Sequence, residues 1–196
     1  MALDGPYTLD DLLVMTGHKP KRARPLPPLI RHAKTETKNL RLLGIDPGTR
    51  FVGWGIIEKS ARDGSVRLID CGCISPSTKL ELKDRLVEIF AELEEIIVRL
   101  KPDAAALEET FAGVNMKSAI AMGEGRGIAL LCLARAKLEI LEIAPRSIKQ
   151  AVAGNGGASK FQVASMVCAQ LNLKRAPEPE DVTDALAAAL ALARRV

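Results

Sequence analysis

Three sets of carboxylates lie at places where the sequence is otherwise apolar. Asp46 ends the apolar run LRLLGID, and Glu108 and Glu109 interrupt the end of AAALEET. Asp181 and Asp184 are three residues apart in EDVTDALAAAL, so they share one face of a predicted helix. Acids at the ends of buried elements repel one another unless something positive lies between them. Together they favour a carboxylate cluster that holds a hard divalent cation.

Each acid also has an ordinary structural interpretation. Asp46 could cap the turn that follows it through a side-chain hydrogen bond. One of Glu108 and Glu109 must point outward, because side chains alternate along a strand. Asp181 could be the N-cap of its helix or a first-turn acid favoured by the helix dipole. One by one these interpretations are favoured, whereas the acids taken together favour the metal site.

Histidine is missing from the part of the sequence that carries these acids. Both histidines, His18 and His32, precede residue 40. This excludes Ser/His/Asp and Cys/His nucleophilic catalysis, histidine-ligated zinc and a histidine general base from residues 40–196. Mg²⁺ takes oxygen ligands and keeps waters and substrate phosphate oxygens. Two such ions about 3.5–4 Å apart can activate a water and stabilise the leaving oxygen of a phosphodiester.

The elements that must position these acids can be predicted from hydrophobic spacing and turn residues. Pro47 and Gly48 predict a type II turn, with a positive φ at Gly48, between the first two strands. In chain order we expect strands over 40–46, 51–59 and 66–75, a helix over 82–100, a strand over 103–110, a helix over 115–136, a strand over 138–145, and helices over 146–152, 159–171 and 180–194. This order predicts an α/β fold: a five-stranded mixed sheet, three antiparallel strands followed by parallel ones, with helices on both faces.

Length and composition predict one globular domain with an extension. The chain has 196 residues, of which 47% are hydrophobic and 27% charged. Residues 1–39 hold five of the eleven prolines and a basic cluster, which predicts a flexible N-terminal extension before a domain over 40–196. No apolar run has the length of a membrane span, and the N-terminus lacks a secretory layout, so we expect a cytoplasmic protein without a membrane partner. The four scattered cysteines are expected to be reduced, buried thiols.

Charge is unevenly distributed along the predicted domain. Residues 80–110 carry 4 basic and 9 acidic side chains, whereas residues 111–177 carry 9 basic and 3 acidic ones. The second segment is therefore a candidate surface for a polyanion. Ordinary solvated helix faces explain the same pattern equally well when it is taken alone.

Four blocks of the sequence carry a resemblance to a known family. They read LGIDPGTRFVGWGII, ALEETFAGVNMKSAIAMGEGRG, APRSIKQAVAGNGGASKFQV and EDVTDALAAAL. In this order they resemble the RuvC family of Holliday-junction resolvases, within the RNase H-like nuclease superfamily, over residues 40 to about 195. The resemblance implies an RNase H-like fold and a homodimer that binds four-way junction DNA and makes paired, symmetric, metal-dependent nicks.

The resemblance also implies which acids are catalytic. The family's metal ligands match Asp46, Glu108, Asp181 and Asp184, which assigns Glu109 the outward position. Some members have a histidine where Asp181 stands. Two Mg²⁺ ions in each active site are implied, with Mn²⁺ as a substitute. The RuvA–RuvB branch-migration complex is a further candidate partner.

Five other residues receive a role from the resemblance. Lys149 and Lys160 match lysines that face the junction phosphates, and Phe111 matches an aromatic residue that stacks on bases at the junction centre. Gly123 and Gly127 share one face of a predicted helix that the resemblance makes the dimer contact. The alternatives are a solvated lysine at a helix cap, a core phenylalanine, and glycines packed closely on the protein's own sheet.

Two other functions share parts of this pattern. Another RNase H-like nuclease, acting on branched DNA or on RNA, would use the same acids. A phosphate-binding ATPase or sugar kinase would share the GIDPGT turn, but it would need a duplicated domain, and 196 residues without a repeat disfavour that. A non-catalytic junction-binding protein is disfavoured by the four acids.

Overall fold

The computed structural model describes residues 38–109 and 116–196, and these contain five strands. The strands are β1 (Leu40–Asp46), β2 (Val52–Lys59), β3 (Val66–Ile74), β4 (Ala104–Glu108) and β5 (Glu139–Ile143). Their order in the sheet is β3-β2-β1-β4-β5. β1, β2 and β3 pair antiparallel, whereas β4 runs parallel to both β1 and β5. The predicted mixed sheet is confirmed.

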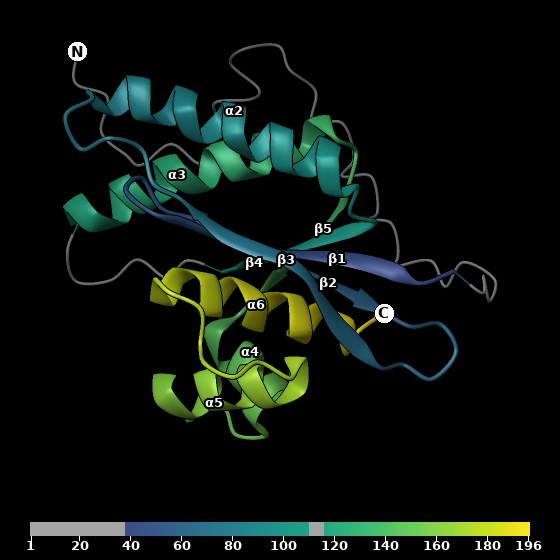
Figure 1. The fold of residues 1–196 in the computed structure, drawn as a ribbon. Helices are drawn as coiled ribbons and strands as arrows, with labels where there is room; N and C mark the ends of the chain where they lie inside the picture. Colours follow the sequence, from purple (N-terminus) through teal and green to yellow (C-terminus); the bar gives the residue numbers. More distant parts are fainter. Residues whose placement is uncertain (1–37, 110–115) are drawn as a thin grey trace, which may run out of the picture. The chain divides into compact units, whose positions relative to one another are not determined.

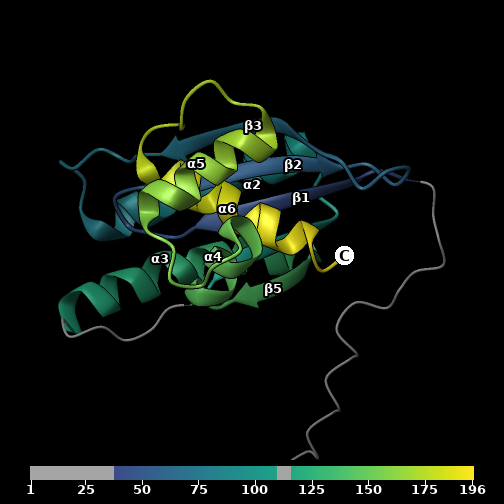
Figure 2. The same ribbon diagram turned by 90° about the horizontal axis from the view of Figure 1, so that it is seen from below.

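Helices cover both faces of this sheet, as predicted. The described helices are α2 (Leu82–Leu100), α3 (Met116–Arg135), α4 (Pro145–Ala153), α5 (Lys160–Leu171) and α6 (Glu180–Ala193). α2 and α3 lie on one face (Figure 1). α6 lies against the other face, with α4 and α5 packed outside it (Figure 2). Within the described residues, no helix combines the length and apolarity needed to cross a membrane.

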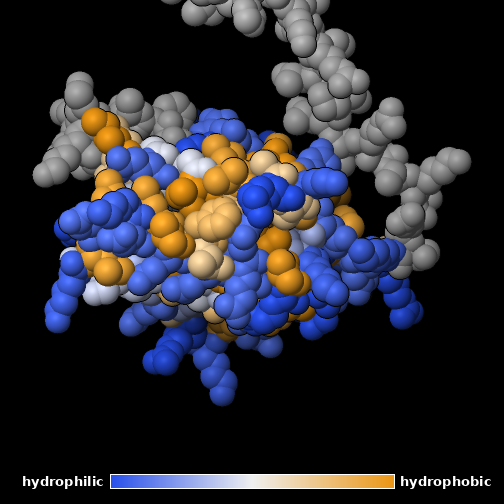
Figure 3. Space-filling view, turned by 90° about the horizontal axis from the view of Figure 1, so that it is seen from above, coloured by the Kyte–Doolittle hydropathy of each residue, from blue (hydrophilic) through white to orange (hydrophobic). Residues whose placement is uncertain are grey.

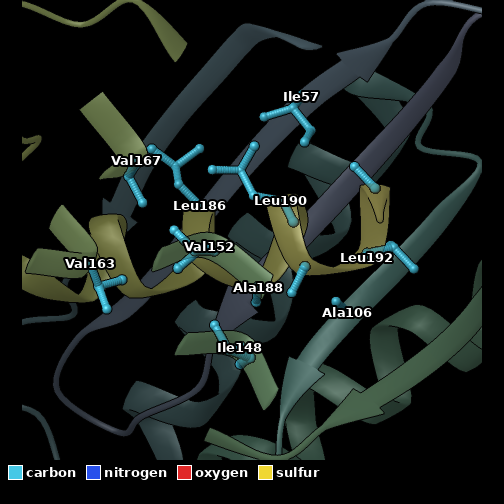
Figure 4. Close-up of a cluster of buried hydrophobic side chains, with 14 of the residues drawn as sticks. Ile57, Ala106, Ile148, Val152, Val163, Val167, Leu186, Ala188, Leu190 and Leu192 are labelled. Atoms are coloured by element: carbon cyan, nitrogen blue, oxygen red, sulfur yellow. The ribbon is translucent and has the colours of Figure 1, made fainter. Parts of the chain in front are cut away.

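Side chains of the central strands alternate between two hydrophobic cores. In β1, Leu42 belongs to the core beneath α4, α5 and α6, which Figure 4 shows in close-up. Leu43 and Ile45 belong to the other core, beneath α2 and α3. Because successive side chains of a strand point to opposite faces, even-numbered residues of β1 face α6. The same alternation holds in β4, where Ala106 faces α6 and Leu107 faces the opposite way.

Glycines in β1 and β2 let the backbone of α6 lie directly on the sheet. A Cβ atom at Gly44 would overlap the carbonyl oxygen of Ala185, and one at Gly53 would overlap the carbonyl oxygen of Asp181. Ala185 and the alanines that follow it along α6 are buried. Small residues on both surfaces therefore bring α6 closer to the sheet than larger side chains would allow.

The connection between β1 and β2 differs from the prediction. It spans residues 47–51, so Phe51 lies in the connection, and the positive φ expected at Gly48 is wrong. Five residues reverse the chain without the left-handed conformation that a tight type II turn requires. A glycine is still needed at this position, because a Cβ atom at Gly48 would overlap the carbonyl oxygen of Phe51 in the same connection.

The first described residues contact the domain. The Lys38 ammonium lies 2.7 Å from a carboxylate oxygen of Asp103, and the Asn39 side chain donates to Glu58 at 3.2 Å. The division into an extension over 1–39 and a domain over 40–196 stays a prediction, because residues 1–37 lie outside the described part of the chain.

Candidate active site

Because side chains alternate along a strand, two of the predicted acids lie on the face of the sheet that α6 covers. Asp46 ends β1 with the same parity as Gly44, and Glu108 ends β4 with the same parity as Ala106. Because β1 and β4 are parallel neighbours, their carboxyl ends meet at one edge of the sheet. Both side chains are partly buried. Glu109 has the opposite parity, which gives a structural reason for choosing Glu108.

The first two turns of α6 bring the other two acids to the same edge. Asp46 pairs with Gly53 in the sheet, and the backbone of Asp181 lies directly over Gly53. Asp184 follows one turn later and is partly buried. The N-cap of α6 is Pro179, so the N-cap interpretation of Asp181 is wrong. Within the described residues, the Asp46 carboxylate has no hydrogen bond, which also removes the turn-capping interpretation.

The acids at this edge perturb one another electrostatically. Burial raises the pKa of Asp46 from 3.8 to about 7, and the charges of Asp184, Asp181 and Glu108 add to the effect. Burial and the charge of Asp184 likewise raise the pKa of Glu108. The pKa of Asp184 is raised mainly by burial, against the opposing charge of Lys160. Four carboxylates from three elements therefore form one repulsive cluster.

Two lysines lie beside this cluster. The Lys160 ammonium is 3.1 Å from a carboxylate oxygen of Glu180 and 3.5 Å from one of Asp184. Lys149 of α4 lowers the pKa of Glu108 through its charge. Both lysines line one pocket of about 150 Å³ together with Glu108 and Asp184. A capping box between Ser159 and Gln162 fixes the start of α5, and so positions Lys160.

The donor set of the cluster fits a hard cation that keeps part of its own hydration. Among the residues that the structure describes, no three acidic, histidine or cysteine side chains lie close enough together to hold a metal ion by themselves. The carboxylates act on one another through their charges, and a cation that keeps waters needs only a few protein oxygens. Asp46, Glu108, Asp181 and Asp184 could hold such an ion.

The remaining predicted site residues have different outcomes. Phe111 lies outside the described residues. Gly123 and Gly127 have open space where a Cβ atom would be, so the interpretation that they pack on the protein's own sheet is wrong. The glycine of α3 that does pack closely inside the domain is Gly125.

Two residues near the cluster were missed by reasoning from the sequence. Glu180 shares the Lys160 ammonium with Asp184. Arg126 of α3 donates to the backbone carbonyl of Glu108 at 2.6 Å. A first-turn acid beside a predicted lysine could have indicated Glu180. For Arg126 no signal in the sequence distinguishes it from the other charged residues of its helix.

Comparisons with known proteins identify the family of this chain. A family model described as crossover junction endodeoxyribonuclease RuvC matches residues 42–192. The crossover junction endodeoxyribonuclease RuvC of Chloroflexus aggregans is 47% identical over 152 residues, which make up 77% of this chain and 91% of the relative. A corresponding protein of Roseiflexus is 44% identical over 150 residues, or 76% and 88% of the two chains.

Solved structures show the same relationship. The structure of T. thermophilus RuvC in complex with Holliday junction substrate is 35% identical, with a TM-score of 0.72, over 78% of this chain and 92% of that one. A yeast mitochondrial Holliday junction resolvase is 14% identical with a TM-score of 0.58, covers 78% of each chain, and so shares the fold. This chain belongs to the RuvC family of crossover junction endodeoxyribonucleases, which are metal-dependent nucleases.

Proposed function

We propose that this protein resolves four-way (Holliday) junctions by paired, symmetric hydrolysis of phosphodiester bonds in DNA recombination and repair. One observation carries the proposal: four carboxylates from β1, β4 and α6 act on one another beside two lysines at a single sheet edge. Such acids suit metal ions, and such lysines suit a phosphate backbone. The complex of the T. thermophilus relative with Holliday junction substrate supports the same substrate class here.

The metal we propose is Mg²⁺, two ions in each active site, with Mn²⁺ as a substitute. Asp46, Glu108, Asp181 and Asp184 would hold them. When bound, the ions supply an activated water and charge stabilisation for the leaving oxygen. The protein contributes rigid placement, because two ligands end hydrogen-bonded strands and two lie on the first turns of a helix packed on glycines. The raised pKa of Asp46 supports the assignment, since a nearby cation would favour its ionised form.

The two lysines and one aromatic residue would hold the DNA. Lys160 begins α5, so its ammonium and the free N–H groups of the helix N-terminus both favour a phosphate. Lys149 faces the same pocket from α4. Phe111, which we propose on the family resemblance, would stack on bases at the junction centre.

A homodimer would present two such sites to two strands of like polarity. Ile120, Gly123, Gly127 and Leu131 share one face of α3, and Ile120 and Leu131 are 57% and 49% exposed. Figure 3 views this side of the domain, where apolar side chains lie among charged ones. Open glycines beside exposed apolar residues suit a second copy of the same helix. We further propose a cytoplasmic location and the RuvA–RuvB branch-migration complex as a partner.

The test compares cleavage of a synthetic four-way junction with cleavage of a linear duplex of the same sequence. We expect Mg²⁺-dependent, symmetric nicks in the junction and little cleavage of the duplex. Asp46→Asn should bind the junction in a gel-shift assay with wild-type affinity, because phosphate contacts and water activation depend on different residues. The variant should lose nicking, whereas the matched control Asp70→Asn, at an exposed ion pair with Arg99, should keep it.

Two results would contradict the proposal. Equal cleavage of junction and duplex would show no selectivity for the four-way junction and would refute the resolvase function. Undiminished nicking by Asp46→Asn would remove Asp46 from the proposed metal ligands.

A further inference from the structure

Arg126 of α3 is a charged residue that is buried in the folded domain. It is 9% exposed, one of the few polar or charged residues buried in the described part of the chain. A guanidinium stays charged at any physiological pH, and its burial is unfavourable unless it is paired and hydrogen-bonded. The groups that pair with Arg126 therefore indicate what it does.

Both partners of Arg126 belong to strands that end beside the candidate active site. Its Nη1 donates to the backbone carbonyl oxygen of Glu108 at 2.6 Å. Its Nη2 forms an ion pair with the carboxylate of Glu142 in β5. The next N–H along the chain, that of Glu109, donates to the carbonyl of Ile143 at 2.9 Å. The end of β4 is therefore attached both to its neighbouring strand and to α3.

The residue before Arg126 makes a second contact at the same sheet edge. Gly125 lies so close to the turn after β1 that a Cβ atom would overlap the carbonyl oxygen of Gly48. That turn begins directly after Asp46. Consecutive residues of α3 thus touch the ends of both strands that carry a candidate metal ligand. Neither contact uses a carboxylate of the cluster.

We propose that Arg126 is a positioning residue that fixes the direction of Glu108 and, together with Gly125, sets its spacing from Asp46. A hydrogen bond to the carbonyl of Glu108 restrains the peptide from which that side chain projects. Glu142 keeps the guanidinium in place and compensates its charge. This inference rests on the proposed metal site and adds residues outside the ligand set.

The test uses Arg126→Gln and Arg126→Lys, with Arg135→Gln as the matched control. Arg135 lies on the same helix, is exposed, and pairs with Glu94. For Arg126→Gln we expect a single-turnover cleavage rate lowered about 10- to 100-fold and weaker Mn²⁺ binding by a similar factor, as for other residues that orient ligands. Junction affinity in a gel-shift assay should change less than about twofold. The cleavage rate and Mn²⁺ affinity of Arg126→Lys should lie between those of the wild type and of Arg126→Gln. A lysine ammonium keeps the charge but cannot bind the carbonyl of Glu108 and the carboxylate of Glu142 with two separate nitrogens.

Several measurements separate this role from a general effect on folding. Mn²⁺ binding is measured by titration calorimetry on the protein alone, at a temperature where circular dichroism shows that each variant is folded. If Arg126→Gln does not fold, Glu142→Gln replaces it, and we expect weaker Mn²⁺ binding by a smaller factor. Wild-type Mn²⁺ affinity and cleavage rate in the folded variant would overturn the inference. A wild-type protein that binds Mn²⁺ but cleaves no junction would instead refute the proposed function.

Discussion

Asp46→Asn should make the protein more stable at alkaline pH when divalent metal is chelated. Burial and neighbouring acids raise the pKa of Asp46 from 3.8 to about 7 in the folded chain. Between these values the folded state keeps a proton that the unfolded state has released. The contribution of Asp46 to the free energy of unfolding is therefore fully present below pH 3.8, and it is lost as the pH rises to about 7. Asparagine has nearly the same shape but does not ionise, so Asp46→Asn should not lose stability as the pH rises.

The size of the effect follows from the pKa interval. Each pH unit corresponds to about 1.4 kcal/mol, so the whole interval from 3.8 to about 7 corresponds to about 4 kcal/mol. About 3 kcal/mol of this falls between pH 5 and pH 8. Relaxation of the site and partial solvation reduce it, so we expect Asp46→Asn to gain about 1–3 kcal/mol over the wild type across that range.

Urea unfolding at pH 5 and pH 8 in the presence of a chelator measures this difference. The free energy of unfolding of Asp46→Asn, relative to wild type, should rise between the two pH values, whereas Asp70→Asn should show no comparable rise. Adding Mg²⁺ at pH 8 should stabilise the wild type more than Asp46→Asn, because a ligand that binds only the folded state increases its stability. A constant difference between Asp46→Asn and wild type at both pH values would refute the reasoning.

Three further changes test other parts of the structure. Lys149→Gln should weaken junction binding whatever the base sequence and lower the salt slope of the logarithm of the binding constant by about one, measured by gel shift at several salt concentrations. Gly53→Ala should destabilise the fold by about 1–3 kcal/mol in urea unfolding, and should lower cleavage by displacing Asp181, since its Cβ would overlap the α6 backbone. Gly127→Arg should turn a dimer into a folded monomer in light scattering; an unchanged mass would place the dimer contact elsewhere.

Much of the fold could be predicted because its strands and helices have strong local patterns. The apolar runs of β1 and β2, the helical spacing of α2 and the stop at Lys101-Pro102 each depend on neighbours in sequence. Parallel strands after the first three were expected because helices separate them, and parallel strands need a long crossover. That β1 and β4 are neighbours was not predicted. Asp46 was recognised in the same way, because one carboxylate after the apolar run at residues 42–45 is unusual.

The sequence could not reveal contacts that depend on three-dimensional packing. Gly125 looks like an ordinary glycine within a helix, yet a Cβ atom there would overlap the carbonyl oxygen of Gly48, 77 residues earlier in the chain. Arg126 looks like a surface charge on a helix, because nothing nearby in sequence indicates the carbonyl of Glu108 as its partner. In both cases the deciding atom is a backbone oxygen, which every residue has, so no residue type marks the partner.

The position of α6 shows how residues without chemistry of their own determine the site. Asp46 and Asp181 are 135 positions apart, and no hydrogen bond joins them. They meet because Gly44 and Gly53 leave room on the sheet for the backbone of α6. A larger residue at Gly53 would lift the first turn of α6, and Asp181 with it, while leaving every carboxylate in place in the sequence. The distance between the two carboxylates thus depends on the two glycines beneath the helix, which have no side chains to hold it away from the sheet. The acids alone do not specify the active site.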